Sequence, residues 1–303
     1  MRIVVLAGGL GGSRLARALA EAIDPGELTI VGNVGDDVEV LGVHVSPDLD
    51  SVLYALTGLH DDERGWGRAD ESWHALETVA ELGGESWFRL GDRDLGLHLV
   101  RTQALRRGEP LSAVTGRLTT AAGVTSRIVP ATDEPLRTHV ATPAGAFSFQ
   151  EWFVGRRHED DVDAVSFDGA DAASPAPGVL EAIHDAEAIV FAPSNPYVSL
   201  GPILAVAPIR EAIALRRVRC VAVSPLIGGR AVKGPLDRML TRMAGGTTPA
   251  HVADCYEGLI DALVVDAADA PAEAAVPLVV TETLMTDRVA AGQLAETVLE
   301  AAA

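Results

Sequence analysis

Cysteine is scarce in this chain of 303 residues. Only Cys220 and Cys255 occur, and they stand too far apart to form a metal-binding or redox pair motif. Two cysteines also argue against a disulfide framework, because proteins that depend on one carry several bridges. We therefore expect a protein of the reducing cytoplasm.

Positive charge is scarce as well. The chain has 43 acidic but only 24 basic side chains, and its formal net charge is −19. A general DNA- or RNA-binding protein needs a positive surface to displace counterions from phosphates, so no nucleic-acid partner is expected. Anionic small molecules are not excluded, because a metal ion or a few arginines reverse the field locally.

Long apolar runs are absent, and none approaches the roughly 20 residues of a membrane-spanning helix. The apolar start of the chain breaks at Gly8, which is too early for a signal-peptide core, and it predicts a buried first strand. The chain is 48% hydrophobic and 22% charged, which is enough for a large core and argues against wholesale disorder. We expect a soluble protein with no membrane partner.

A strand, glycine turn, helix and strand follow one another at the start of the chain. Ile3–Ala7 is a β-branched run, Leu15 and Leu19 repeat at helical spacing, and 28–31 is a second apolar run. Similar continuous runs, which are typical of strands buried on both faces, occur at 188–192, 218–223 and 259–265. The predicted fold is α/β and Rossmann-like, with a mostly parallel sheet and helices on both faces.

The middle of the chain has a different pattern. Helical segments are predicted at 71–82 and 95–107, and short alternating pieces lie near His139 and Phe147. We predict one α/β domain over residues 1–303, with a core from about 1–58 and 174–303. A mixed α/β, cap-like insertion is predicted at about 59–173.

The first candidate site is the glycine turn that contains Gly9, Gly11 and Gly12. Glycines between a strand and a helix let backbone N–H groups approach a phosphate at the helix N-terminus. The alternative is a plain tight turn with Ser13 as the helix N-cap. Arg14 stands where a Rossmann fingerprint has its third glycine, so the pattern does not favour NAD.

The second candidate is a group of four aspartates. Two follow the second strand, and two fall in the first turn of a helix that Pro47 begins and Ser46 caps; they are Asp36, Asp37, Asp48 and Asp50. Acidic residues near a helix start also complement its dipole, which explains one or two of them better than four. Because such loops border the crevice of an open α/β sheet, we predict a Mg²⁺ site.

Three further loops have less specific signals. Arg89 and Arg93 would offer forked donors to an anion, or they form ordinary surface ion pairs beside a capped turn. Ser194 and Asn195 stand between two prolines after an apolar strand, which favours a stiff binding loop over a plain connection. Lys233, the only lysine of the chain, is either a phosphate ligand or a chance survivor.

Histidine and tryptophan have no ligand-like spacing. Their positions favour strand, helix or packing roles, although a tryptophan would also stack on a flat ring. These residues are His44, His98, His139, Trp66, Trp73, Trp87 and Trp152.

Several long motifs occur in an order that resembles the 2-phospho-L-lactate transferase family (CofD, called FbiA in mycobacteria). They are GGLGG, NVGDD, SPDLDSVLYAL, FRLGDRDLGLHLVR, FQEWFVGRR, APSNPYVSLGPIL and SPLIGG, and the likeness extends almost to the C-terminus. The resemblance implies an enzyme of coenzyme F-420 biosynthesis. Its acceptor would be the ribityl-deazaflavin Fo, its donor phospholactate or phosphoenolpyruvate activated as a guanosine diphosphate conjugate, and its by-product GMP.

The resemblance also implies roles for individual residues. Asp36 and Asp48 match the family's metal positions, which implies Mg²⁺ as the cofactor. Asp50 and Arg89 match positions that contact Fo, and Asp50 would orient the attacking hydroxyl or accept its proton. The nucleotide-diphosphate side would consist of Gly9, Gly11, Gly12, Ser194 and Asn195. A homodimer is expected on the same ground.

One departure and two alternatives stay open. Some relatives have N-T-A-[DE]-D where this chain has residues 33–37 as NVGDD, which leaves the loop's part in donor choice undecided. A nucleotide-sugar-binding regulator without catalysis is the main alternative, and an NAD-dependent oxidoreductase is the weaker one.

Overall fold

The computed structural model describes residues 1–61 and 63–303. Its centre is a seven-stranded sheet in the order β14-β13-β10-β9-β1-β2-β5, and all neighbouring strands are parallel. The strands are β1 (Ile3–Ala7), β2 (Leu28–Gly32), β5 (Arg127–Pro130), β9 (Ala188–Phe191), β10 (Arg219–Val223), β13 (Ala262–Asp266) and β14 (Leu278–Thr281). The continuous apolar runs thus form the buried strands, as predicted.

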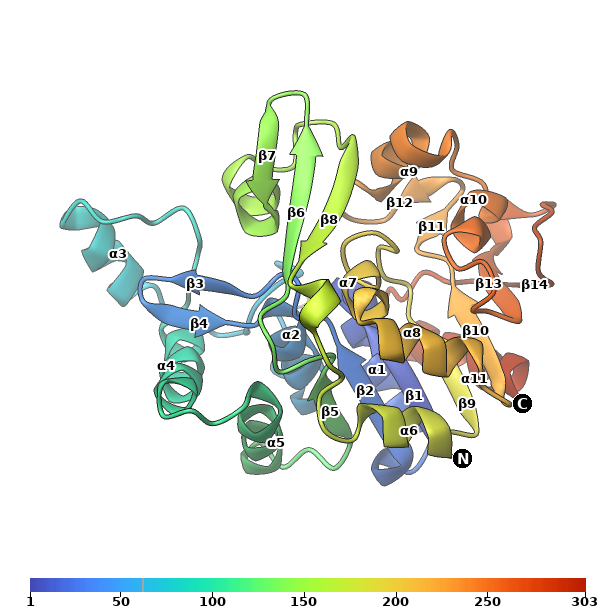
Figure 1. Ribbon diagram of the computed structural model, residues 1–303, viewed down its shortest axis with the longest axis horizontal. Helices are drawn as coiled ribbons and strands as arrows, with labels where there is room; N and C mark the ends of the chain where they lie inside the picture. The colour runs from blue at the N-terminus through green and yellow to red at the C-terminus, as the bar shows by residue number, and fades with distance from the viewer. Residues whose placement is uncertain (62) are drawn as a thin grey trace.

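Helices cover both faces of this sheet, which confirms the predicted α/β class. One layer contains α1 (Gly9–Ala22), α2 (Pro47–Thr57) and α11 (Arg288–Ala302), which pack against each other. Figure 1 shows the other layer in front of the sheet, with α6 (Val179–Asp185), α7 (Gly201–Ala205) and α8 (Ala207–Ala214). The alanine and leucine face of α1 is buried against β1 and its neighbours.

The strand order reverses between β1 and β9. From β1 the chain adds β2 and then β5 on one side, and from β9 it adds β10, β13 and β14 on the other. The connections therefore leave β1 and β9 in opposite directions, which opens a crevice at the carboxyl ends of these two strands. The glycine turn follows β1 here, and Pro193 with Ser194 follows β9.

Two excursions from the sheet surround this crevice (Figure 1). The first contains a hairpin and helices: β3 (Val38–Val40), β4 (Val43–Val45), α3 (His74–Glu81), α4 (Asp92–Arg106) and α5 (Leu111–Ala121). The second is an antiparallel arm: β6 (Arg137–Thr142), β7 (Gly145–Ser148), a π-helical turn (Glu151–Gly155) and β8 (Ala164–Asp168). Smaller elements near the C-terminal half are β11 (Leu226–Ile227), β12 (Arg230–Ala231), α9 (Leu236–Ala244) and α10 (Pro249–Asp254).

The predicted boundaries of the insertion need correction. β5 lies inside the range 59–173, yet it pairs with β2 in the central sheet, so two excursions flank it instead of one insertion. The hairpin β3–β4 stands outside the sheet although it falls within 1–58. β5 was missed because its apolar centre is only Ile128 and Val129, too short a run to show a period. That the whole chain is one domain stays a prediction.

In the described part of the chain, no helix has both the length and the apolar content needed to cross a membrane.

Candidate active site

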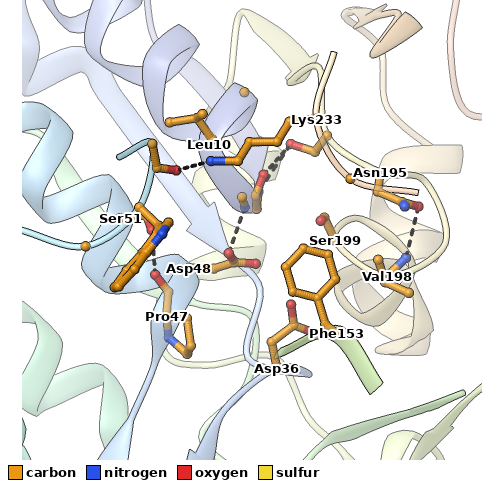
Figure 2. Close-up of a pocket in the computed structure, with 18 of the residues that line it drawn as sticks. Leu10, Asp36, Pro47, Asp48, Ser51, Phe153, Asn195, Val198, Ser199 and Lys233 are labelled. Carbon is orange, nitrogen blue, oxygen red and sulfur yellow. Dashed lines mark hydrogen bonds between the residues drawn. The ribbon is translucent and has the colours of Figure 1, made fainter. Parts of the chain in front are cut away.

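A cavity of about 570 Å³ lies at the strand-order reversal. Its wall combines the glycine turn, the start of α2, His60, the segments 65–67 and 87–90, and the loops after β9 and β10. The arm adds the rings of Phe149 and Phe153, which stack on each other with centroids 5.1 Å apart. Figure 2 shows the carboxylates of Asp36 and Asp48 turned toward the same space, beside Phe153.

The glycine turn is shaped by its neighbours. Gly9 has φ +66° and lines the cavity together with Gly11. A Cβ on Gly11 would collide with the Pro193 carbonyl oxygen, and a Cβ on Gly12 would lie 2.8 Å from Ser194 Oγ. Gly12 thus packs behind the cavity wall, so its lack of a side chain serves the fit between two loops more than contact with a ligand.

The alternative interpretation of the glycine turn, in which Ser13 is the N-cap of α1, is wrong. The helix already begins at Gly9, and Ser13 Oγ donates to the Leu10 carbonyl 3.0 Å away, inside the helix. The Gly9 N–H donates instead to Asp48 Oδ1, at 2.7 Å. A carboxylate from α2 therefore binds the start of α1, which complements the positive end of that helix dipole.

Asp48 has both oxygens occupied by neutral donors. Oδ2 accepts from Asn33 Nδ2 at 2.9 Å, and Oδ1 accepts from Gly9. Pro47 begins α2 as predicted, but Ser46 does not cap it with its side chain. Ser46 Oγ donates to Asp37 Oδ2 at 2.8 Å instead.

The two aspartates after β2 have different surroundings. Asp37 Oδ2 also contacts His44 Nε2 at 2.9 Å, so this carboxylate joins the hairpin β3–β4 to the loop. Asp36 lines the cavity, is buried, and has an oxygen, Oδ1, with no hydrogen-bond partner among the described residues. The structure thus brings Asp36 and Asp48 to one cavity and assigns Asp37 to the scaffold.

Burial and mutual repulsion make Asp36 and Asp48 weak acids. Burial is the largest cause that raises the pKa of Asp36 well above its usual range, followed by the charge of Asp48. Burial also raises the pKa of Asp48 to about 6, against the hydrogen bonds from Asn33 and Gly9. Like charges crowded in a low-dielectric site favour a proton or a metal ion between them.

A divalent cation fits this pair of carboxylates. Within residues 1–61 and 63–303 no group of three or more histidine, cysteine or acidic side chains is arranged to hold a metal. Mg²⁺ needs no such group, because it usually binds one or two carboxylates and completes its shell with substrate phosphates and water. Asp36, whose carboxylate is turned toward the cavity in Figure 2 and has an oxygen without a partner among the described residues, is a suitable hard ligand.

Asp50 also lines the cavity, but both its oxygens accept hydrogen bonds from Arg101, one of them from Nη1 at 3.0 Å. His98 Nδ1 lies 3.7 Å from Asp50 Oδ2. Neither Arg101 nor His98 was predicted as a site residue, because both look like ordinary residues of α4. No sequence pattern around either residue indicates a role in the site.

Asp94 is an acid of the cavity wall that was not predicted from the sequence. It lines the cavity, and the Tyr54 hydroxyl donates to its Oδ1. Burial raises the pKa of Asp94 to about 6, although the bond from Tyr54 opposes the shift.

The predicted Fo contact Arg89 stands at the rim of the cavity. Its guanidinium carbon lies 4.4 Å from the ring centroid of Trp73, whose ring also faces Arg64 at 5.2 Å. The ring centroid of Trp66 lies 4.8 Å from the guanidinium carbon of the same Arg64, and the centroids of the two tryptophan rings are 6.1 Å apart. Arginines and flat rings thus alternate at the rim, an arrangement that suits a planar ligand. Trp152 is fully buried, as the packing interpretation predicted.

Ser194 and Asn195 shape the wall opposite the aspartates. Ser194 Oγ donates to the Gly8 carbonyl at 2.7 Å, and Asn195 Oδ1 accepts from the Tyr197 N–H at 2.9 Å. Both line the cavity, but these bonds hold the loop to itself and to the glycine turn.

Two cations lie near the glycine turn, Lys233 and Arg14. Lys233 Nζ donates to the Gly65 carbonyl at 2.9 Å, and burial followed by the charge of Arg14 lowers its pKa. Arg14 reaches the cavity from α1 and was noticed in the sequence only as a departure from the Rossmann fingerprint. Positive charge beside a helix N-terminus favours a phosphate group.

The sequence profile described as 2-phospho-L-lactate transferase CofD matches residues 3–290. The chain belongs to the 2-phospho-L-lactate transferase family. A phosphoenolpyruvate transferase of Streptomyces coelicolor is 46% identical, over 99% of this chain and 100% of that protein. Proteins of the same name are 45% identical in Thermobifida fusca, over 89% and 88% of the two chains, and 40% identical in Nocardia farcinica, over 94% and 90%.

A solved structure supports the fold of this transferase family member. A Bacillus halodurans protein described as a member of the UPF0052 family superposes with a TM-score of 0.64, at 18% identity over 98% of both chains. At that identity the likeness shows the fold alone. The family match and the names of the relatives favour a transferase over the nucleotide-sugar regulator and the oxidoreductase.

The buried acids of this transferase family member predict a particular pH dependence. Asp36, Asp48 and Asp94 have raised pKa values, so the folded state keeps their protons to higher pH than the unfolded state does. Their contribution to stability is present below about pH 4. That of Asp48 and Asp94 is lost as the pH rises through about 6, and that of Asp36 is lost as the pH rises through its own raised pKa. His98, whose pKa burial lowers to about 4, works in the opposite direction but is a single group.

In EDTA we therefore expect the melting temperature to fall between about pH 5 and pH 7.5. Excess Mg²⁺ should restore it at the higher pH, because a bound cation neutralises the same carboxylates. Differential scanning fluorimetry across this range provides the measurement. A melting temperature that is independent of Mg²⁺ at pH 7.5 would contradict the cation site.

Proposed function

We propose that this protein transfers a phosphoenolpyruvyl or phospholactyl group from a guanosine-diphosphate-activated donor to the terminal ribityl hydroxyl of Fo. GMP leaves, the cofactor is Mg²⁺, and the reaction belongs to coenzyme F-420 biosynthesis. The observation that carries the proposal is the pair of buried carboxylates, Asp36 and Asp48, that face one cavity at the strand-order reversal. Family membership supports the reaction class, and the relatives' names support phosphoenolpyruvate as the transferred group.

In this reaction a ribityl oxygen forms a bond to the phosphorus that bears the three-carbon acid. The anhydride bond between that phosphorus and the GMP phosphate breaks, and the hydroxyl proton leaves to a base or to water. Such phosphoryl-group chemistry depends mainly on positioning and charge neutralisation. Mg²⁺, held by Asp36 and Asp48, would supply positive charge to the diphosphate.

The side chains around the cavity divide into two sets. The glycine turn, Arg14 and Lys233 provide backbone donors and positive charge for the donor's phosphates. The acceptor Fo binds on the other side, against Arg89 and Trp66 at the rim and beside Asp50. Phe153 closes the space between the two sets and limits the access of water.

The decisive assay combines purified protein, Fo, Mg²⁺ and each guanylylated acid, followed by mass spectrometry of the products. We expect the Fo phosphodiester and GMP in equal amounts, more from the phosphoenolpyruvyl donor, and neither product in EDTA. If neither donor yields product, the proposal is wrong, and the nucleotide-sugar-binding regulator becomes the hypothesis to test. The cytoplasmic location and the homodimer remain predictions from the sequence.

A further inference from the structure

Five carboxylates are buried around the cavity, and their charges are compensated very unequally. They are Asp36, Asp37, Asp48, Asp50 and Asp94. Asp37 contacts a histidine, Asp94 a tyrosine hydroxyl, and Asp48 a backbone N–H and an amide. Of these five carboxylates, only Asp50 has an arginine bound to both of its oxygens in the described part of the chain.

The Asp50–Arg101 pair joins α2 to α4. Arg101 is 1% exposed, and its two terminal nitrogens each donate to a different oxygen of Asp50. A planar guanidinium bound in this forked way fixes the plane of the carboxylate, which a lysine cannot do. Asp50 lies two residues after Asp48 in the same first turn of α2, yet its charge is already neutralised.

His98 also contacts the guanidinium, on the side of the Asp50 carboxylate. Its Nδ1 lies 3.3 Å from Arg101 Nη1, and because a guanidinium has no lone pair, Nδ1 must be the acceptor. The ring is buried and burial keeps it neutral by lowering its pKa to about 4. Arg101 thus donates both to Asp50 and to the neutral imidazole of His98, which lies one helical turn before it on α4.

We propose that Arg101 is a positioning residue, which keeps Asp50 facing the acceptor alcohol and prevents it from joining Asp36 and Asp48 as a ligand of the cation. This inference rests on the proposed function for the identity of the alcohol. The two bonds from Arg101 fix both oxygens of Asp50. The lone pairs that Arg101 does not use can still accept a hydrogen bond from a hydroxyl at the cavity surface.

A purely structural role is the competing explanation. Buried ion pairs contribute little net stability compared with apolar packing, but removal of one partner destabilises a protein strongly. Loss of activity in a single variant would therefore not separate the two roles. A double-mutant cycle does, because effects that act through Asp50 disappear once Asp50 is replaced.

The test compares wild type, Arg101→Lys, Asp50→Asn and the double variant in the Fo transfer reaction. We expect Arg101→Lys to lower kcat by about 10- to 100-fold, the cost of a displacement near 1 Å, with the donor KM unchanged. The double variant should turn over within twofold of Asp50→Asn alone. Multiplied losses in the double variant, or an unchanged kcat in Arg101→Lys, would overturn the proposal.

A second measurement does not require turnover. Mn²⁺ binding, followed by electron paramagnetic resonance, should be several-fold tighter in Arg101→Gln, because the released Asp50 becomes a further carboxylate ligand. The gain should vanish in Arg101→Gln with Asp50→Asn, a variant that also removes both buried charges and so keeps the fold. Equal Mn²⁺ affinity in wild type and Arg101→Gln would contradict the inference.

Arg216→Lys is the matched control. Arg216 is largely buried and forms an ion pair with Asp261 at 2.8 Å, but neither residue lines the cavity. We expect this variant to keep wild-type kcat and Mn²⁺ affinity. If wild type itself makes no Fo product, the proposed function fails, whereas the Mn²⁺ comparison still decides how Asp50 and Arg101 are arranged.

Discussion

An Asp36→Asn variant is expected to lose Mg²⁺-dependent turnover by about 10²- to 10³-fold and yet to melt at a higher temperature than wild type in EDTA. The loss follows because a neutral amide is a much weaker ligand for a hard cation than a carboxylate. The gain follows because Asp36 is buried beside Asp48, has an oxygen without a partner, and no arginine is bound to it among the described residues. The substitution removes the repulsion between Asp36 and Asp48, and so stabilises the folded state when no cation is bound.

The measurements are initial rates of Fo transfer at several Mg²⁺ concentrations and melting curves in EDTA and in Mg²⁺. Asp168→Asn provides the control, because Asp168 is an exposed acid on β8, outside the cavity. It should change neither the rate nor the melting temperature noticeably. An Asp36→Asn variant with wild-type turnover would show that Asp36 does not bind the catalytic cation.

The second large effect is expected for Gly11→Ala. The new Cβ would overlap the Pro193 carbonyl oxygen, which is backbone and cannot rotate away as a side chain does. The glycine turn and the loop after β9 must then separate, at a cost of about 1–3 kcal/mol in the free energy of unfolding. Because these loops form part of the cavity wall, we expect turnover to fall at least tenfold as well.

Urea denaturation and the Fo transfer rate measure these two effects. Gly116→Ala is the control: Gly116 is an exposed residue of α5 with open space around its Cα. That substitution should raise the free energy of unfolding by about 0.4–1 kcal/mol, because alanine favours helix and restricts the unfolded chain. If Gly11→Ala is as well tolerated as Gly116→Ala, the close approach of the two loops does not hold in solution.

Five strands of the central sheet were predicted, and β5 and β14 were not; each of the five is a continuous apolar run next to turn residues. β1, β2, β9, β10 and β13 all lie at or within two or three residues of the runs that predicted them. β5 was missed because a four-residue edge strand with two apolar residues has no measurable period. Its place beside β2 depends on the chain's return to the sheet after an excursion, which no local pattern specifies.

The candidate site was predictable in part for the same reason. Asp36 and Asp48 stand at the carboxyl end of β2 and at the start of α2, so topology alone brought them to the crevice. Neither Ser13 nor Ser46 caps its helix, because α1 already begins at Gly9 and the Ser46 hydroxyl donates to Asp37. Arg101, His98 and Asp94 were missed because each meets its partner in α2 from about 40 to 50 residues away.

The sequence by itself determined the fold class, the crevice at the carboxyl ends of the strands, and the family, because these depend on short patterns in chain order. Only the tertiary structure decided which aspartate is neutralised by arginine, which belongs to the scaffold, and which lines the cavity without an arginine partner in the described part of the chain. The physical reason is that the state of a buried charge depends on the groups packed around it, and here those groups come from distant segments of the chain.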